Sequence, residues 1–298
     1  MTQERTIAFL GLGVMGGPMA GHLAAAGYTV TAWNRSEQRR SDWADRQSTD
    51  AQAFATIAEA VEGAHIVAAC VGNDDDLAQV VLGPKGALAA MSSGALLIDH
   101  TTTSAAMARR VAGEAAGREI GFVDAPVSGG QAGAENGKLA IMCGASADDF
   151  TRAEPVMQSY AARIVHVGDV GAGQTAKMAN QMCIAGTLAG LSEAIRLSQA
   201  SGLDTDKVFE AISGGAAQSW QMDNRWATMA QDEFDFGFAI DWMRKDLGYA
   251  LDEAKRLGLS SPVSALVDQF YAEIQAMGGA RQDTSALIRR LPKGNTPT

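Results

Sequence analysis

The sequence predicts an α/β fold in which an open, doubly wound sheet is followed by a long helix and an all-α C-terminal domain. From residue 6 to about residue 167, short β-like runs alternate with alanine-rich helical stretches, a pattern typical of a parallel sheet covered by helices. A glycine-rich segment follows at residues 170–173, and the rest of the chain shows helical patterns and no convincing strand. We therefore expect domains at residues 1–167 and 201–298, with an interdomain helix within residues 168–200.

Seven apolar runs predict the strands of the sheet. They span residues 6–10, 28–33, 65–71, 95–99, 121–124, 139–143 and 163–167. Five stretches in the later part of the chain have the spacing of helices. These cover residues 174–200, 205–212, 219–231, 238–258 and 262–277. Gly202 is suited to end the first of these helices, and Pro262 is suited to begin the last.

The composition restricts the class of function. The chain has 298 residues, 47% of them hydrophobic and 19% charged, which suits a globular protein of two domains. Its formal net charge of -10 argues against nucleic-acid binding, because phosphate backbones are bound by clustered Lys and Arg. No stretch of about 18 apolar residues occurs, so we expect no membrane span. The three cysteines and four histidines lack disulfide or metal-ligand spacing, so we expect buried thiols, a cytoplasmic protein and no metal site.

A glycine motif directly after the first predicted strand indicates a dinucleotide-binding Rossmann domain. Gly11 permits a tight turn, Gly13 lets the backbone approach a pyrophosphate, and Gly16 lets a helix pack closely on the strand. The N-terminus of that helix would face the anion. The alternative is a glycine-rich turn without a ligand, but its place between a strand and a helix argues against it. The expected cofactor contacts are Gly11, Leu12, Gly13, Val14, Met15 and Gly16.

The second predicted strand is followed by Asn34 and Arg35, and this pair favours NADP over NAD. An acid at this place accepts hydrogen bonds from the ribose 2′-hydroxyl of NAD, and it would repel the 2′-phosphate of NADP. A neutral Asn34 followed by the guanidinium of Arg35 would bind that phosphate. NAD remains the alternative, because Arg35 is also compatible with an ordinary surface charge.

The ends of the third and fourth predicted strands extend the expected cofactor site. Val71 and Asn73 belong to the end of the third strand, and Thr102 follows the fourth within a run of three threonines. Ligands of open α/β sheets bind at the carboxyl ends of the strands. The alternative is that Thr and Ser residues here cap the next helix, a role that is compatible with cofactor contact.

A glycine-rich loop between the fifth and sixth predicted strands indicates a second anion site. Ser128 is followed by Gly129 and Gly130, and backbone N–H groups of such a segment form a nest that can hold a small carboxylate. We expect these residues to bind substrate.

Lys177, Asn180 and Gln181 form a polar cluster on the predicted long helix. Residues three and four apart share a helix face, so the three side chains should project together from an otherwise apolar helix. A solvated polar stripe is the alternative explanation of such a pattern. We expect Lys177 to be the proton donor and acceptor of a redox reaction, with Asn180 and Gln181 as substrate contacts.

Taken together, these segments resemble the β-hydroxyacid dehydrogenase family, which includes 3-hydroxyisobutyrate dehydrogenase, tartronate semialdehyde reductase and the glyoxylate and succinic semialdehyde reductases. Four motifs carry the resemblance in the family's order, and they extend over nearly the whole chain. They lie at residues 11–19, 124–130, 171–180 and 245–247. Gln181 departs from the family pattern, because many members have a second Asn at this place.

The resemblance implies roles for individual residues. Lys177 would be the general acid and base, Ser128 to Gly130 and Asn180 would contact the carboxylate and hydroxyl of the substrate, and Thr102 and Lys245 would contact the cofactor. The implied activity is NADP-dependent interconversion of a small β-hydroxy acid with its semialdehyde or keto acid, so the partner is a small carboxylate-bearing aldehyde or hydroxy acid. The alternatives are an NAD-linked 3-hydroxyisobutyrate dehydrogenase and a catalytically idle NADP-binding sensor or scaffold. An alanine-rich helical domain further suggests a homodimer or homotetramer.

Overall fold

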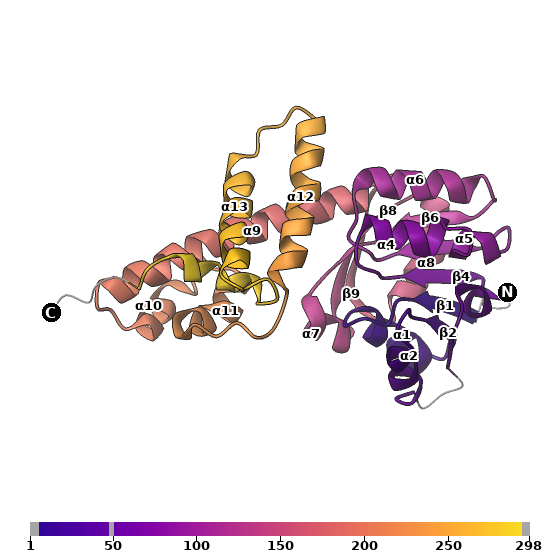
Figure 1. Ribbon diagram of the computed structural model, residues 1–298, viewed down its shortest axis with the longest axis horizontal. Helices are drawn as coiled ribbons and strands as arrows, with labels where there is room; N and C mark the ends of the chain where they lie inside the picture. The colour runs from indigo at the N-terminus through magenta and orange to yellow at the C-terminus, as the bar shows by residue number, and fades with distance from the viewer. Residues whose placement is uncertain (1–5, 48–50, 294–298) are drawn as a thin grey trace. The chain divides into compact units, whose positions relative to one another are not determined.

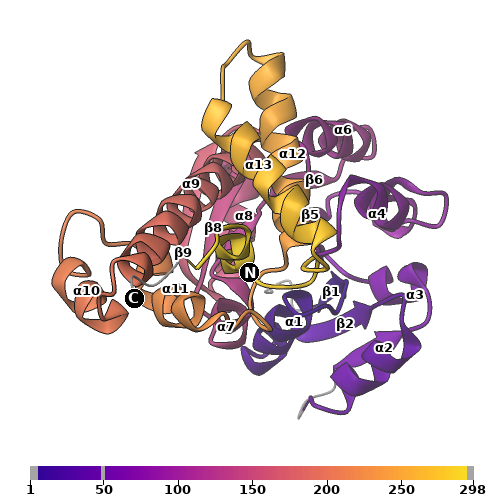
Figure 2. The ribbon, with the colours of Figure 1, turned by 60° about the vertical axis from the view of Figure 1, so that its left-hand side comes forward.

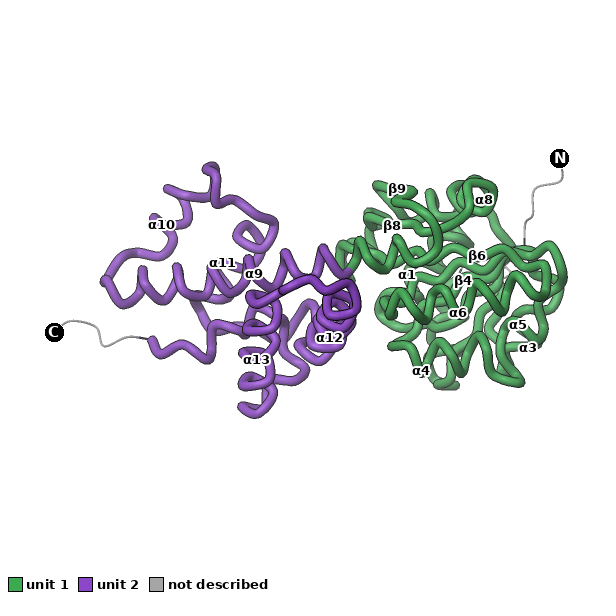
Figure 3. The backbone as a smooth tube through the Cα atoms, turned by 90° about the horizontal axis from the view of Figure 1, so that it is seen from above, with its two compact units in different colours: residues 1–177 green, residues 178–298 purple. Residues whose placement is uncertain are grey.

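The computed structural model describes residues 6–47 and 51–293, and the chain divides into two compact units. Unit 1 is Met1–Lys177 and unit 2 is Met178–Thr298. The division falls within the long helix α9, Ala172–Ala200, as the change of colour in Figure 3 shows. The helix that carries Lys177 therefore belongs to both units.

Unit 1 contains a mixed, mostly parallel sheet. Its strands are β1 (Thr6–Leu10), β2 (Thr29–Trp33), β3 (Gln52–Phe54), β4 (Ile66–Ala69), β5 (Leu96–Asp99), β6 (Gly121–Asp124), β7 (Val127–Ser128), β8 (Leu139–Ala145) and β9 (Ala161–Gly168). The order is β3-β2-β1-β4-β5-β6-β8-β7, with β9 paired to β8. The strands from β1 to β6 are parallel to their neighbours, whereas β8 is antiparallel to β6 and β7.

The doubly wound sheet confirms the prediction, and all seven predicted strands are present. β3 and β7 were not predicted, because two or three residues are too few to show an alternating pattern. β8 was expected in a parallel sheet but is antiparallel to β6.

Helices cover both faces of this sheet. They are α1 (Gly16–Ala25), α2 (Glu37–Ala44), α3 (Ile57–Val61), α4 (Asp74–Leu77), the π-helix η1 (Ala78–Leu82), α5 (Ala87–Ala90), α6 (Ala105–Ala116), α7 (Gly130–Glu135) and α8 (Ala147–Met157). Alternate residues of β1 enter different cores: Ile7 and Phe9 pack with α1 and α8, while Ala8 and Leu10 pack with α3 and α6. Figure 1 shows α4 and α6 on one side of the strands and α1 and α2 on the other.

Unit 2 is all-α, as predicted. After α9 it contains α10 (Thr205–Ile212), α11 (Trp220–Gln231), α12 (Ile240–Arg256), α13 (Pro262–Ala276) and the 3-10 helix η2 (Thr284–Arg290). Its core is built around the buried rings of Trp226 and Tyr271, and α12 and α13 run side by side (Figure 2). The sequence pattern gave no indication of η2, which the carboxylate of Asp283 caps by accepting a hydrogen bond from the N–H of Ser285 at 3.0 Å.

The helix ends follow local chemistry. α9 ends at Ala200, and Gly202 adopts a φ of 68°, which a glycine tolerates without a Cβ clash. Pro262 occupies the first turn of α13, where its missing N–H costs nothing.

The expectation of buried thiols was correct for Cys143 and wrong for Cys183, which lies on an exposed position of α9. Across residues 6–47 and 51–293, no helix combines the length and the hydropathy needed to cross a membrane.

Candidate functional site

The glycine loop between β1 and α1 is open only at its middle position. A Cβ at Gly11 would overlap the carbonyl oxygen of Cys70, and one at Gly16 would overlap that of Gly11. At Gly13 a Cβ would have a single described neighbour within 4 Å, the Nη1 atom of Arg39 at 3.8 Å. Packing therefore explains Gly11 and Gly16 but not Gly13, where the backbone is open to close approach.

The N-terminus of α1 differs from those of neighbouring helices. Among the described residues, no side chain caps α1 at Met15, and its first turn has no acid. Five other helices of unit 1 have side-chain caps, from Ser36, Thr56, Asn73, Ser104 and Ser146. Backbone carbonyls already accept from the N–H groups of Gly17 and Met19, at 2.9 and 3.3 Å, and Pro18 has no N–H. What favours an anion at this helix end is therefore the helix dipole together with the absence of an acid.

After the end of β2, the side chain of Asn34 is hydrogen-bonded to the glycine loop, whereas the side chain of Arg35 is exposed. The side-chain oxygen of Asn34 accepts a hydrogen bond from the N–H of Leu12 at 3.0 Å, and so ties β2 to the glycine loop. Its carbonyl oxygen accepts from Nη1 of Arg40 at 2.8 Å. The side chain of Arg35 is 79% exposed, and its Nη1 atom lies 3.6 Å from a carboxylate oxygen of Asp76. The sequence did not reveal the loop-tying role of Asn34.

The other predicted cofactor contacts of unit 1 lie on the loops after β4 and β5. The N–H of Val71 donates to Oγ1 of Thr101 at 3.0 Å. Asn73 caps α4 by accepting from the N–H of Asp76 at 2.8 Å. The cap of α6 is Ser104, whose side chain accepts from the N–H of Met107, so the expected capping comes from the serine and not from the three threonines before it. Thr102 is half-buried in the same loop.

The predicted carboxylate nest is an exposed turn between β7 and α7. Gly129 has a φ of 129° and Gly130 a φ of 61°, both in the region that favours glycine. No described side chain caps α7, and Gly129 and Gly130 are exposed while Ser128 is half-buried.

The carboxylate of Asp124 holds the first turn of α9. Its Oδ1 atom accepts a hydrogen bond from the N–H of Gly171 at 2.7 Å, and its Oδ2 atom accepts from the N–H of Gln174 at 2.9 Å. Gly173 lies so close to the sheet that a Cβ would come within 2.5 Å of the carbonyl oxygens of Asp124 and Met142. The sequence motif that begins at Asp124 does not by itself reveal this capping role, because the capped helix begins almost 50 residues later in the chain.

Lys177 lies one turn further along α9 and is buried, at 7% exposure. Gln174 and Gln181 on the same side of the helix are 0% and 1% exposed. A solvated polar stripe is therefore the wrong interpretation of this face.

In unit 2, Gln181 joins α9 to α12. Nδ2 of Asn180 donates to Oε1 of Gln181 at 2.9 Å, and Nε2 of Gln181 donates to Asp246 at 2.6 Å. The ammonium of Lys245 lies 3.2 Å from the other oxygen of Asp246 and 5.4 Å from the ring centre of Tyr249. Three predicted site residues thus meet around a buried acid that the sequence interpretation did not single out.

Two buried acids of unit 1, Asp99 and the helix-capping Asp124, have raised pKa values. Asp99 and Asp124 are partners across β5 and β6, and both are buried. Burial raises the pKa of Asp99 to about 7 and that of Asp124 to about 6. Burial also lowers the pKa of His100 to about 4, and its ring nitrogens lie 2.7 Å from the oxygen of Ala125 and 2.8 Å from that of Tyr160.

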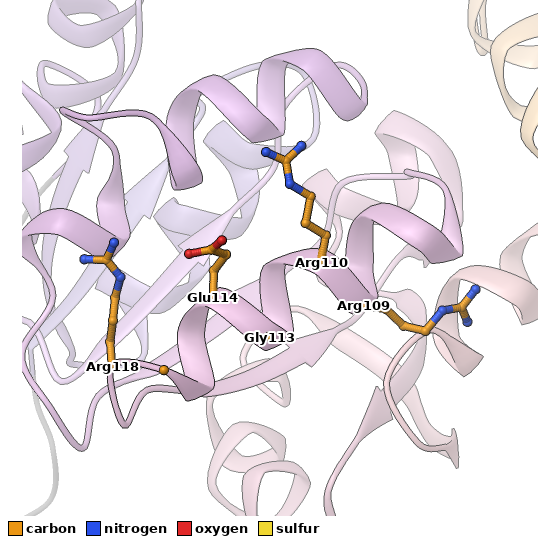
Figure 4. A pocket seen from close by; sticks show the side chains of 6 residues that line it. Arg109, Arg110, Gly113, Glu114 and Arg118 are labelled. Carbon is orange, nitrogen blue, oxygen red and sulfur yellow. The ribbon is translucent and has the colours of Figure 1, made fainter.

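A separate groove along α6 contains none of the predicted site residues. It is lined by Arg109, Arg110, Gly113, Glu114, Gly117 and Arg118. The guanidinium groups in Figure 4 point away from one another, so they do not converge on one ligand. Among residues 6–47 and 51–293, no group of three or more His, Cys, Asp and Glu side chains is arranged to hold a metal.

Two family models match consecutive parts of the chain. The NAD binding domain of 6-phosphogluconate dehydrogenase matches residues 6–168. The model described as NAD-binding of NADP-dependent 3-hydroxyisobutyrate dehydrogenase matches residues 171–291. The boundary between the matches coincides with the first residue whose N–H is held by Asp124, Gly171.

Relatives of nearly the same length agree with these two family matches. An uncharacterized oxidoreductase of Shewanella frigidimarina is 54% identical over 97% of this chain and 99% of its own. A 3-hydroxyisobutyrate dehydrogenase of Pseudomonas aeruginosa is 35% identical over 89% of this chain and 91% of its own. Among solved structures, the Mycobacterium tuberculosis 3-hydroxyisobutyrate dehydrogenase with L-serine has a TM-score of 0.88 at 33% identity, covering 97% of this chain and 99% of that one.

The raised pKa of Asp99 predicts a pH-dependent stability. Its pKa of about 7 in the folded chain exceeds the ordinary value of 3.8, so its contribution to stability is complete below pH 3.8 and is lost as the pH rises through 7. Asp99→Asn removes the carboxyl group that ionises, so the variant should not lose this stability as the pH rises. The free energy of unfolding of the variant relative to the parent should rise by roughly 3 kcal/mol between pH 5 and pH 8.

Urea unfolding at both pH values measures this difference. Asp75→Asn, at an exposed acid of α4, is the matched control and should show no such trend. A constant difference between Asp99→Asn and the parent would contradict the prediction.

Proposed function

The chain belongs to the β-hydroxyacid dehydrogenase family and is an NAD(P)-dependent oxidoreductase that acts on CH–OH groups, and from this premise we propose a narrower function. The proposed reaction is NADP-dependent interconversion of a small β-hydroxy acid and its semialdehyde or keto acid, with Lys177 as general acid and base. The observation that carries it is the burial of Lys177, at 7% exposure, on a helix whose first turn is fixed to the sheet.

The cofactor is proposed to bind at the carboxyl ends of β1, β2, β4 and β5. The uncapped N-terminus of α1 and the open backbone at Gly13 suit its pyrophosphate. The exposed guanidinium of Arg35 suits a 2′-phosphate, while Asn34 adds no negative charge that would repel it. Val71, Asn73, Thr102 and Lys245 are proposed as further contacts.

In this proposal the nicotinamide supplies or accepts the hydride when it is bound. In the reducing direction, Nζ of Lys177 donates a proton to the oxygen that becomes the hydroxyl group. In the oxidising direction the same nitrogen accepts it. A positioned general acid typically contributes ~10²–10⁴-fold to the rate. Asn180 has no proton to give near neutral pH, so its amide orients the substrate instead.

The substrate is proposed to carry a small carboxylate, bound by Ser128 and the N–H groups of Gly129 and Gly130. The open, positive-φ backbone there supports this choice. The M. tuberculosis relative was solved with L-serine, which is itself a β-hydroxy acid with a carboxylate. Gln181 is proposed to set the orientation of Asn180 through their 2.9 Å hydrogen bond.

We also propose that copies of the chain associate through unit 2 into a homodimer or homotetramer. Four large apolar side chains near the junction of α12 and α13 are exposed: Leu257, Leu259, Val263 and Leu266. A group of this kind is typical of an interaction surface.

The protein is also proposed to be cytoplasmic. Its free cysteines, Cys70, Cys143 and Cys183, support this location.

Replacing Lys177 tests the proposed chemistry directly. Lys177→Ala removes the proton donor, so kcat with NADPH and a panel of short semialdehydes and glyoxylate should fall by about 10²–10⁴-fold. The dissociation constant of NADPH, measured by fluorescence, should stay within a few-fold of the parent value. Turnover that survives the substitution would show that another group transfers the proton. Silence of the parent chain across the panel would favour an idle NADP-binding module.

The preference for NADP depends on Arg35. In Arg35→Asp the guanidinium is replaced by a carboxylate that repels the 2′-phosphate and can accept from a 2′-hydroxyl. The ratio of kcat/KM for NADPH to that for NADH should fall by at least about 10-fold, since an ion-paired hydrogen bond contributes roughly 1.5–3 kcal/mol. Arg46→Asp makes the same charge change at an exposed position after α2 and should leave the ratio unchanged. An equal ratio in the parent and Arg35→Asp would exclude this phosphate contact.

A further inference from the structure

Gln174 is a buried side chain, and both ends of its amide are hydrogen-bonded. It is 0% exposed. Nε2 donates to the carbonyl oxygen of Thr101 at 2.7 Å, and Oε1 accepts from the N–H of Thr103 at 3.0 Å. Because a carbonyl only accepts and an N–H only donates, these two partners fix which way the amide points.

The two partners of the amide lie on either side of Thr102. Gln174 therefore clamps the backbone of the β5–α6 loop from both sides of a proposed cofactor contact. Its own N–H donates to Asp124, which ties the same residue to β6. Removing the amide while these groups stay buried would cost the free energy of their desolvation, so the loop should shift when Gln174 is replaced by an apolar residue.

The hydrogen bonds continue from this loop to β4. Oγ1 of Thr101 accepts from the N–H of Val71 at 3.0 Å, and the N–H of Thr101 donates to Asp99 at 2.9 Å. One network within unit 1 thus joins the segments that carry Val71 and Thr102 to the first turn of α9. Lys177 follows Gln174 by three residues on that helix.

We propose that Gln174 is a positioning residue that holds the cofactor loop at Thr102 in fixed register with Lys177. Gln174 itself touches neither substrate nor cofactor. It acts through the backbone on both sides of Thr102 and through the first turn of α9. This inference rests on the proposed function, because it concerns the two residues to which that function assigns cofactor contact and proton transfer.

Gln174→Leu tests the clamp. It removes both amide hydrogen bonds and puts an apolar side chain of similar size in place of the amide. Misplacing a reacting group by about 1 Å can cost roughly 10²-fold in rate, so kcat should fall by about 10–100-fold. The dissociation constant of NADPH should rise several-fold because Thr102 is displaced.

The matched control is Gln199→Leu on the same helix. Nε2 of Gln199 donates to the oxygen of Ala230 at 3.0 Å, and its Oε1 accepts from Arg196 at 2.7 Å, so this variant also loses two amide hydrogen bonds. It should lower the unfolding temperature but leave kcat and NADPH binding near the parent values. Equal losses of kcat in the two variants would reduce Gln174 to a structural role.

Gln174→Glu provides a second readout through pH. A carboxylate still accepts from the N–H of Thr103, but it can donate to the oxygen of Thr101 only when protonated. Three acids lie around this position, Asp74 beyond Ser104, Asp99 on β5 and Asp124 on β6, and they favour the protonated form. The cations Arg109, beside Gly171, and Lys177 oppose them.

The ratio of kcat in Gln174→Glu to kcat in the parent should therefore be highest near pH 5.5 and should fall by several-fold toward pH 8. A ratio that does not change with pH, together with kcat for Gln174→Leu within twofold of the parent, would overturn the proposal. The dissociation constant of NADPH for Gln174→Leu tests the contact at Thr102 independently of turnover. Failure of the proposed function, seen as turnover retained in Lys177→Ala, is thus distinguished from failure of the clamp.

Discussion

The seating of the first turn of α9 on the sheet is the interaction on which the rest of the proposed site depends. Both carboxylate oxygens of Asp124 accept N–H groups there, from Gly171 at 2.7 Å and from Gln174 at 2.9 Å. The positive end of the helix dipole and these two hydrogen bonds favour the ionised acid, while burial opposes it and dominates in raising its pKa to about 6. Gly173 lets the helix approach the carbonyl groups of β6 and β8 without a clash. The direction in which α9 leaves the sheet, and with it the place of Lys177, follows from these contacts.

The N-termini of α9 and α1 differ in whether a side chain caps them. Asp124 occupies the N-terminus of α9, so that helix is fixed and offers no site for an anion. α1 has no side-chain cap among the described residues, and a Cβ added at Gly13, just before it, would have one described neighbour within 4 Å, an arginine nitrogen at 3.8 Å. The N-terminus of α9 thus has a structural role, and the N-terminus of α1 is the proposed binding place of the pyrophosphate. The same distinction separates Asn34, which ties β2 to the glycine loop, from Arg35, which remains exposed.

Sequence reasoning found the features that are local in the chain. Strands of four or more residues and helices with apolar periodicity were predicted, and the motif around Gly11 was placed correctly between β1 and α1. Short elements such as β3, β7 and η2 were missed because they contain too few residues for a period. The contacts of Gln174 were also missed, for a different reason. Its partner Thr101 is 73 residues away and Asp124 is 50 residues away, and no local pattern reveals which distant groups a buried amide will meet. The roles of Lys177, Ser128 and Arg35 rest on motifs and resemblance, which indicate chemistry without showing a bound ligand.

The central claim is that Nζ of Lys177 exchanges a proton with the hydroxyl oxygen of the substrate. A crystal structure of the chain with NADP⁺ and a small β-hydroxy acid, such as L-serine or 3-hydroxyisobutyrate, measures this geometry directly. We expect Nζ within about 2.6–3.2 Å of the hydroxyl oxygen, and the substrate carboxylate on Ser128 and the N–H groups of Gly129 and Gly130. A substrate hydroxyl held by another titratable group, with Lys177 outside hydrogen-bond distance, would contradict it.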